Sequence, residues 1–93
     1  MHEDVKRALR ITTDYFDTDV QDLIEAAKAD LILSGVLSAK IVDTDQLIKR
    51  AIILYVKANF GLDNQDSEKY MASFTSLKMH LTLSQEYTFV VVV

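Results

Sequence analysis

The sequence contains no cysteine, no proline and only two glycines among its 93 residues. Without cysteine there is no disulfide, no thiolate nucleophile and no cysteine-based metal site. Proline and glycine are the residues that most weaken helices, so their scarcity favours helices throughout the chain. Both glycines, Gly35 and Gly61, fall where predicted helices would stop. The composition therefore predicts an all-α fold.

Long apolar runs and catalytic motifs are also missing. No run reaches the roughly 18–20 apolar residues of a membrane span, and the N-terminal MHEDVKRALRI lacks the apolar segment of a signal peptide. The two histidines, His2 and His80, lie far apart, and no glycine-rich phosphate loop is present. The aspartates between residues 14 and 22 lack the spacing and glycine of a calcium loop. We therefore expect no enzyme activity, no cofactor, no metal and no membrane contact.

Negative charge is concentrated in the first third of the chain. Residues 1–30 contain eight acidic and four basic residues, whereas residues 31–93 contain six of each. Nucleic acid is an improbable direct ligand for such a surface, because phosphate binding needs clustered lysine and arginine. With 49% hydrophobic residues, the chain has the composition of a globular protein, and its length predicts one domain over residues 1–93.

The apolar spacing predicts a small bundle of three main helices with a short N-terminal helix. We expect helices over residues 3–11, 18–34, 43–61 and about 66–83, giving a helical core over about 3–84. The third is apolar on nearly all sides and is predicted to be the central core helix. Capping boxes are predicted at Thr18 with Gln21 and at Asp43 with Gln46. In the link before the second helix, Tyr15 and Phe16 are expected to pack beneath that helix.

The C-terminal residues EYTFVVVV, 86–93, have a different pattern. They are β-branched and aromatic, which favours a strand, yet the rest of the chain offers no strand partner. We therefore expect an extended C-terminal tail over about residues 85–93 that invites pairing with another chain. Together with the apolar central helix, this tail favours an interaction protein over a monomer whose apolar faces serve only ordinary core packing.

Four segments in order carry a resemblance to a known family. They are VKRALRI, DVQDLIEAAKADLILSGV, QLIKRAIILYVKANFG and SEKYMASFTSLKMHLTLSQEY. This set, over about residues 5–87, resembles the phage head–tail connector family, also known as DNA-packaging or portal-adaptor proteins of tailed phages and prophages. The resemblance implies a non-enzymatic all-α virion protein at the head–tail interface, present in the host cytoplasm during assembly.

The resemblance also implies partners. Such connectors form a ring of about a dozen copies beneath the portal protein, extend the DNA channel and receive a tail or stopper protein. Genomic DNA passes through without sequence-specific binding, and an acidic channel wall would repel its phosphates and let it slide. Family members bind the portal partly through their C-terminal segments.

These implications give two sets of candidate site residues. The expected portal-binding arm comprises Tyr87, Thr88, Phe89, Val90, Val91, Val92 and Val93. The expected ring contacts or channel face comprise Asp19, Asp22, Glu25, Lys49, Arg50 and Lys57. The three basic residues form either a solvated strip or salt bridges to the acidic second helix of a neighbouring copy.

The alternative function is a small prophage DNA-binding regulator with a helix-turn-helix. Its recognition helix would need basic or amide side chains at an exposed N-terminus. The predicted second and third helices begin instead with DTDVQD and DTDQLI, whose carboxylates oppose phosphate. The sequence therefore favours the structural connector.

Overall fold

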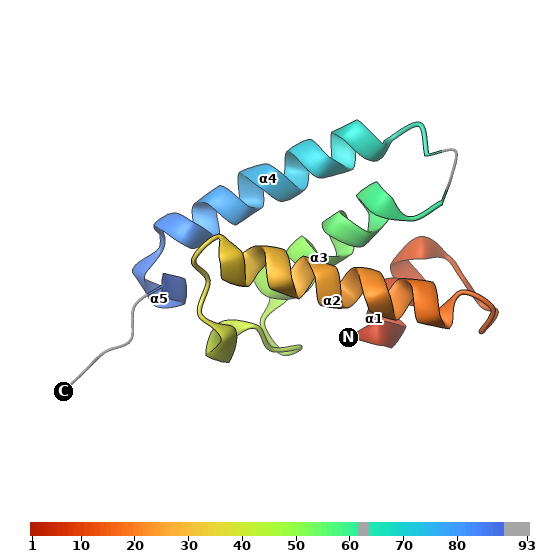
Figure 1. Cartoon of the computed structure of the whole chain (residues 1–93), viewed down its shortest axis with the longest axis horizontal. Helices are drawn as coiled ribbons and strands as arrows, with labels where there is room; N and C mark the ends of the chain where they lie inside the picture. Colours follow the sequence, from red (N-terminus) through yellow and green to blue (C-terminus); the bar gives the residue numbers. More distant parts are fainter. Residues whose placement is uncertain (62–63, 89–93) are drawn as a thin grey trace.

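The computed structural model describes residues 1–61 and 64–88 of the chain. Within these residues the elements are α1 (His2–Leu9), α2 (Asp17–Leu33), the 3-10 helix η1 (Ser38–Lys40), α3 (Gln46–Asn59), α4 (Ser67–Leu83) and α5 (Gln85–Thr88) (Figure 1). The part of the chain so described contains helices and no strand. The all-α prediction is confirmed, with three main helices and a short N-terminal one.

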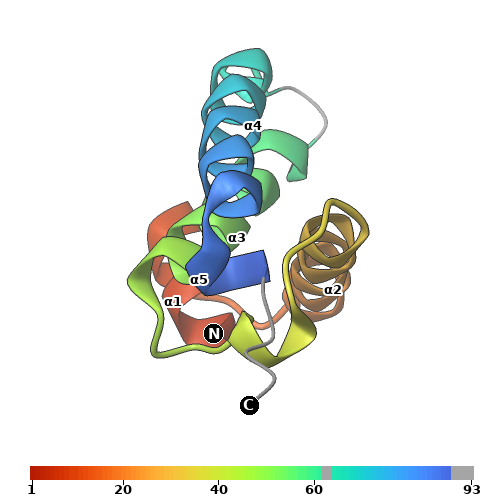
Figure 2. The same ribbon diagram turned by 90° about the vertical axis from the view of Figure 1, so that its left-hand side faces the viewer.

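Helix α3 occupies the centre of the bundle. It packs most extensively on α4 and also on α2, while α1 contacts both α2 and α3. Figure 2 shows α2 and α4 on different sides of α3. The side chains that α3 buries are Ile48, Ala51, Ile52, Leu54, Val56 and Ala58. A helix with so wide an apolar surface must be enclosed by its neighbours, and the prediction of a central core helix is confirmed.

The N-terminal end of α3 differs from the prediction. Asp45, and not Asp43, caps the helix, because its Oδ1 accepts hydrogen bonds from the backbone N–H of Leu47 (2.9 Å) and Ile48 (3.1 Å). Asp43 is engaged elsewhere: its Oδ2 accepts a 2.9 Å hydrogen bond from the Met1 ammonium group. This bond lowers the pKa of Asp43. The predicted capping box was therefore wrong.

The C-terminal end of α3 comes two residues before Gly61. Phe60 is already extended, and Gly61 has a φ of 89°, a value that favours glycine. The side-chain amide of Asn64 donates to the carbonyl groups of Lys57 and Phe60. The open last turn of α3 is thus satisfied by a side chain from the following loop.

Helix α1 is also shorter than predicted. It ends at Leu9 because Arg10 adopts a left-handed conformation, with a φ of 60°. The buried Lys6 joins α1 to the next segment, with its Nζ 2.9 Å from Asp17 Oδ1 and 3.1 Å from Asp14 Oδ1. The hydrogen bonds to Asp17 and Asp14 raise the pKa of Lys6.

Helix α2 buries Val20, Ile24, Ala27 and Leu31. It begins at Asp17 without a side-chain cap, so the predicted Thr18 and Gln21 capping box was wrong. Gln21 donates instead to Glu25 Oε1, 2.9 Å away. At the other end, Gly35 has a φ of 114° and stops the helix as predicted.

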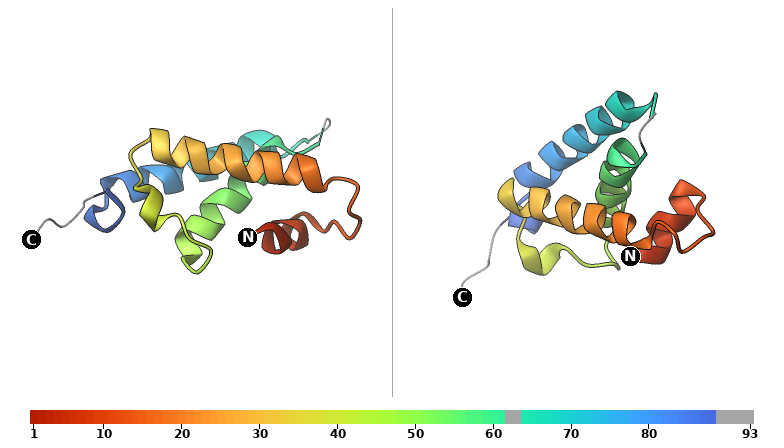
Figure 3. Two further views of the ribbon diagram at one scale, coloured as in Figure 1. Left: turned by 60° about the horizontal axis from the view of Figure 1, so that its bottom comes forward. Right: turned by 45° about the vertical axis from the view of Figure 1, so that its right-hand side comes forward.

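The C-terminal segment turns back on the bundle. Residues 85–88 form the helical turn α5, and Figure 3 shows α5 beside the connector between α2 and α3. The backbone N–H of Leu37, in that connector, donates to the carbonyl of Tyr87 (2.9 Å). The expected extended conformation is therefore wrong for residues 85–88, because burial of Tyr87 outweighs local strand propensity. The rest of the expected strand, residues 89–93, lies outside the described residues.

Candidate functional site

The predicted acidic face lies on the first half of α2. Asp19, Asp22 and Glu25 are all exposed. Glu25 accepts from Gln21 and lies 3.9 Å from Lys28 Nζ. Asp19 and Asp22 make no ion pair with the part of the chain that the structure describes. These two carboxylates therefore leave uncompensated negative charge at the start of α2.

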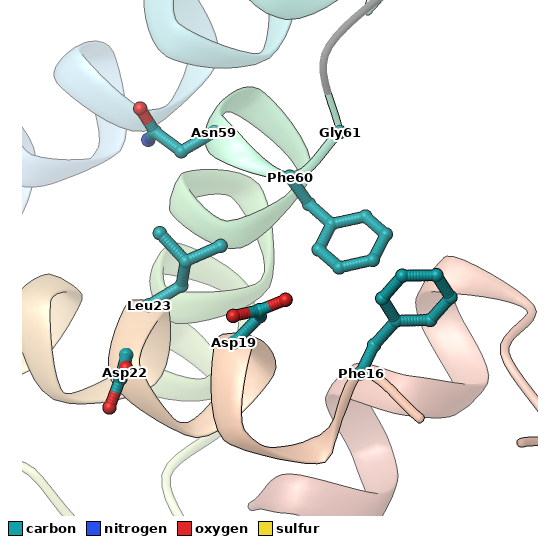
Figure 4. Close-up of a pocket in the computed structure, with 7 residues that line it drawn as sticks. All are labelled: Phe16, Asp19, Asp22, Leu23, Asn59, Phe60 and Gly61. Atoms are coloured by element: carbon teal, nitrogen blue, oxygen red, sulfur yellow. The ribbon is translucent and has the colours of Figure 1, made fainter. Parts of the chain in front are cut away.

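Asp19 and Asp22 line a groove of about 670 Å³ between the start of α2 and the end of α3. Its other lining residues are Phe16, Leu23, Asn59, Phe60 and Gly61. Figure 4 shows Asp19 close to the two aromatic rings and Asp22 one turn further along α2. The groove therefore combines apolar walls with carboxylates.

The two rings of the groove, those of Phe16 and Phe60, pack edge to face. Their centroids are 5.4 Å apart and their planes are inclined by 86°. Phe16 is half-buried, as expected, whereas its neighbour Tyr15 is 84% exposed and does not pack beneath α2. The aromatic walls were not recognised in the sequence, because Phe60 approaches Phe16 only through the packing of α3 on α2.

The three basic candidates of α3 do not form one free patch. Lys49 Nζ lies 3.5 Å from Asp4 Oδ2 on α1. Lys57 Nζ lies 5.3 Å from the centre of the Tyr70 ring on α4, a cation–π contact. Of the three, Arg50 alone is exposed. The packing of α1 and α4 on α3 thus engages two of the three residues within the chain.

The described part of the predicted arm is not free for pairing. Tyr87 is buried, and its hydroxyl donates to Asp45 Oδ2 (2.9 Å). Burial, together with the hydrogen bond to Asp45, raises the pKa of Tyr87 to about 12. The Thr88 hydroxyl donates to the carbonyl of Ser84 (2.8 Å). These two hydrogen bonds anchor the end of α5 to the bundle. The other residues of the predicted arm lie outside the described residues: Phe89, Val90, Val91, Val92 and Val93.

Large apolar side chains are exposed near the C-terminal ends of α2 and α4. They are Ile32 (47% exposed), Leu33 (88%), Met79 (58%) and Leu83 (81%). An ion pair of 2.8 Å between Lys78 Nζ and Asp30 Oδ1 joins the two helix ends. Exposed apolar groups of this size are typical of surfaces that bind other proteins.

Over residues 1–61 and 64–88, no three histidine or acidic side chains are placed to hold a metal ion. Across the same residues, no helix has the length and apolar character needed to cross a membrane.

A comparison with protein families identifies the chain. The family model described as a phage connector protein matches residues 1–88, a span that includes every helix from α1 to α5. No curated protein and no solved structure matches the chain. Since the matched span covers nearly the whole sequence, the chain belongs to the phage connector protein family.

Proposed function

We propose that this phage structural connector protein forms a ring of about a dozen copies beneath the portal, where it extends the DNA channel and joins the head to the tail. The observation that carries the proposal is the family match over residues 1–88. The family is a structural kind of protein and not a class of enzymes. Its members are components of the phage particle and contact other head or tail proteins.

The surface of the bundle supports assembly. A small helical protein that leaves Leu33 and Leu83 more than four-fifths exposed gains by covering them with another protein. In the proposed particle, the portal and a tail or stopper protein cover the apolar ends of α2 and α4. The polar faces of α2 and α3 then supply contacts between copies, with Arg50 as the exposed basic residue of α3.

The portal contact is proposed for residues 89–93, the FVVVV sequence that follows α5. An apolar β-branched segment of this kind can add a strand to the sheet edge of a partner. The Tyr87 bond to Asp45 would fix the point at which this segment leaves the bundle. Anchoring one end lowers the ordering entropy that binding costs.

The DNA channel is proposed to carry acidic side chains on its wall. The net charge of −4 and exposed carboxylates such as that of Glu25 repel phosphate, so DNA would slide past without sequence-specific binding. This role needs no enzymatic group and no cofactor. It also suits the position of a connector in packaging and retaining the genome.

The test is co-purification with the portal protein encoded by the same genome. Three baits are compared: the full chain, a chain ending at Thr88, and a chain in which residues 89–93 are replaced by glycine and serine. The proposal expects capture by the full chain alone. Equal capture by all three would keep the connector role and move the contact onto the helices. If no bait captures the portal, the proposed role is wrong.

A further inference from the structure

We infer that the groove between α2 and α3 binds Arg7 and Arg10 of a neighbouring copy of this chain. The inference rests on the proposed ring and names the contact by which one copy would hold the next. It assigns Asp19 and Asp22 to the junction between copies, and leaves the channel wall to other acidic side chains such as Glu25.

The groove has the chemistry of an arginine site. Asp19 and Asp22 stand one helical turn apart, where like charges repel each other, and no described residue neutralises them. Phe16 and Phe60 supply aromatic surface beside Asp19 (Figure 4). A guanidinium group pairs with carboxylates through a planar fork and also stacks on aromatic rings, so it satisfies both kinds of wall.

Several of the ten basic side chains are already engaged. The Nζ of Lys6 contacts Asp14 and Asp17, and the Nζ of Lys78 contacts Asp30. Lys49 pairs with Asp4, and Lys57 lies over the Tyr70 ring. The basic residues that remain exposed are Arg7, Arg10, Lys40, Arg50 and Lys69.

Arg7 and Arg10 match the groove best among these exposed residues. They lie three positions apart at the end of α1, so this one region offers two guanidinium groups to the two carboxylates. The Arg7 side chain is 79% exposed, and its Nη1 makes only a long 3.4 Å contact with Asp4. The other exposed basic residues offer no such pair: Lys40, Arg50 and Lys69 are widely separated along the chain.

The backbone at Arg10 closes α1, because the N–H groups of Arg10 and Ile11 donate to the carbonyl groups of Arg7 and Lys6 (both 3.0 Å). Its φ of 60° lies in the left-handed region, and Arg10 is the only non-glycine residue with a positive φ in residues 1–61 and 64–88. Glycine or asparagine would occupy this helix end at a lower steric cost. This conformation therefore serves the helix end, and the Arg10 side chain has no partner in the described part of its own chain.

The proposed contact is heterologous. The groove lies on α2 and α3, while the arginine pair lies at the end of α1. The two surfaces differ in residues but adjoin each other, since Arg10 lines a neighbouring hollow together with Phe60 of the groove. Contacts of this kind form closed rings when the rotation between copies closes. The contact is therefore compatible with the proposed ring.

Cross-linking tests the contact directly, because the natural chain has no cysteine. Two single variants, Asp22→Cys and Arg7→Cys, are mixed at high concentration, with one of them isotopically labelled, and treated with a short bis-maleimide. The inference expects a covalent dimer that contains one labelled and one unlabelled chain. The matched control pairs Arg7→Cys with Glu68→Cys, an exposed acidic site on α4, and should yield little product.

Charge reversal gives a second readout. Asp19→Arg with Asp22→Arg should weaken self-association at least about tenfold, and so should Arg7→Glu with Arg10→Glu. Combining all four changes restores attraction and should recover association. The control, Glu68→Arg with Glu86→Arg, alters net charge equally at exposed sites and should leave association unchanged. Sedimentation measures association, and circular dichroism checks that each variant is folded.

Each result decides the question. The contact is supported if Asp22→Cys cross-links to Arg7→Cys and if the variant with all four charge reversals recovers self-association. The contact is overturned if the natural chain stays monomeric at millimolar concentration, or if Glu68→Cys gives as much cross-linked product as Asp22→Cys. It is also overturned if the variant with all four changes does not recover self-association. Portal capture is scored separately: capture without self-association would keep the connector role while discarding this contact. If the α2 reversal abolishes only portal capture, the groove binds a different protein and the inference is wrong.

Discussion

At its N-terminal end α3 is capped by Asp45 and tied to Tyr87. At its C-terminal end Phe60 borders an open groove whose two carboxylates make no ion pair with residues 1–61 and 64–88. The first end is closed within the chain. The second carries charge that no described residue neutralises, in particular at Asp19 and Asp22. One helix thus joins a region organised for stability to a region that has the chemistry of a binding surface.

The contrast follows from where neighbouring segments lie. The turn α5 brings Tyr87 against the start of α3, and the connector adds the Leu37 hydrogen bond to the same place. At the other end, α2 approaches α3 with two carboxylates and no basic side chain. Buried polar groups need partners within the fold, whereas exposed charges are solvated and remain available to pair with another molecule.

The largest effect is expected for Asp45→Ala. The change removes the N-cap of α3 and also the acceptor of the Tyr87 hydroxyl. Losing a cap costs about 1 kcal/mol and leaving a buried hydroxyl unpaired costs about 1–3 kcal/mol. We therefore expect the free energy of unfolding, measured in urea, to fall by about 2–4 kcal/mol. Asp43→Ala, the control two residues away, should cost much less because Asp43 pairs only on the surface.

A smaller loss is expected for Tyr87→Phe. The ring stays buried, but its hydrogen bond to Asp45 is lost, which should lower stability by about 0.5–1.5 kcal/mol. The cap at Asp45 Oδ1 remains, so the loss should be smaller than for Asp45→Ala. An equal loss in the two variants would mean that the Tyr87 bond, and not the cap, holds this end of α3.

Tyr87 also makes this end sensitive to alkaline pH. Its pKa is raised to about 12, above the ordinary value of 10.0, so the folded protein holds this proton more tightly than the unfolded chain. The associated stability is fully present below pH 10 and is lost as the pH rises through about 12. We expect urea midpoints measured between these pH values to fall more steeply for the natural chain than for Tyr87→Phe. If the urea midpoints of the two proteins fell equally with pH, the raised pKa of Tyr87 would not be the source of the alkaline sensitivity.

Much of the fold could be predicted from the sequence, because periodic apolar residues and helix-stopping glycines are local signals. The central position of α3 and the stop at Gly35 were recognised in this way. The caps were not. Asp43 and Asp45 are both acceptable local caps, and each is engaged by a distant part of the chain: Asp43 by the Met1 ammonium group and Asp45 by the Tyr87 hydroxyl.

The candidate site was less accessible to prediction. The exposure of Asp19 and Asp22 could be inferred from the apolar rhythm of α2, but the groove requires Phe60, which arrives through tertiary packing. Lys49 and Lys57 were expected to face solvent or a neighbouring copy, and they are engaged by α1 and α4 instead. Which charges remain available for another molecule depends on such long-range contacts.

At the open end, Arg10→Gly should slightly stabilise the folded monomer. Glycine removes the steric cost of the left-handed conformation at Arg10, and its greater chain entropy offsets part of that gain. We expect the free energy of unfolding to rise by about 0.5 kcal/mol. The same variant should self-associate more weakly, because it lacks one arginine of the proposed contact. If the variant were more stable and also associated as strongly as the natural chain or more strongly, Arg10 would not be part of the contact between copies.

The smallest effect is expected for Asp22→Asn. Asp19 and Asp22 repel each other across one helical turn, and removing one charge should raise stability by about 0.2–0.5 kcal/mol at low salt. Added salt screens this repulsion, so the difference from the natural chain should shrink as ionic strength increases. Thermal unfolding at several salt concentrations measures the difference. Glu68→Gln is the control, since Glu68 has no acidic neighbour one turn further along α4. If the stability gained by Asp22→Asn persists in high salt, its cause is not charge repulsion. The repulsion between Asp19 and Asp22 would then contribute nothing to the binding of a basic partner.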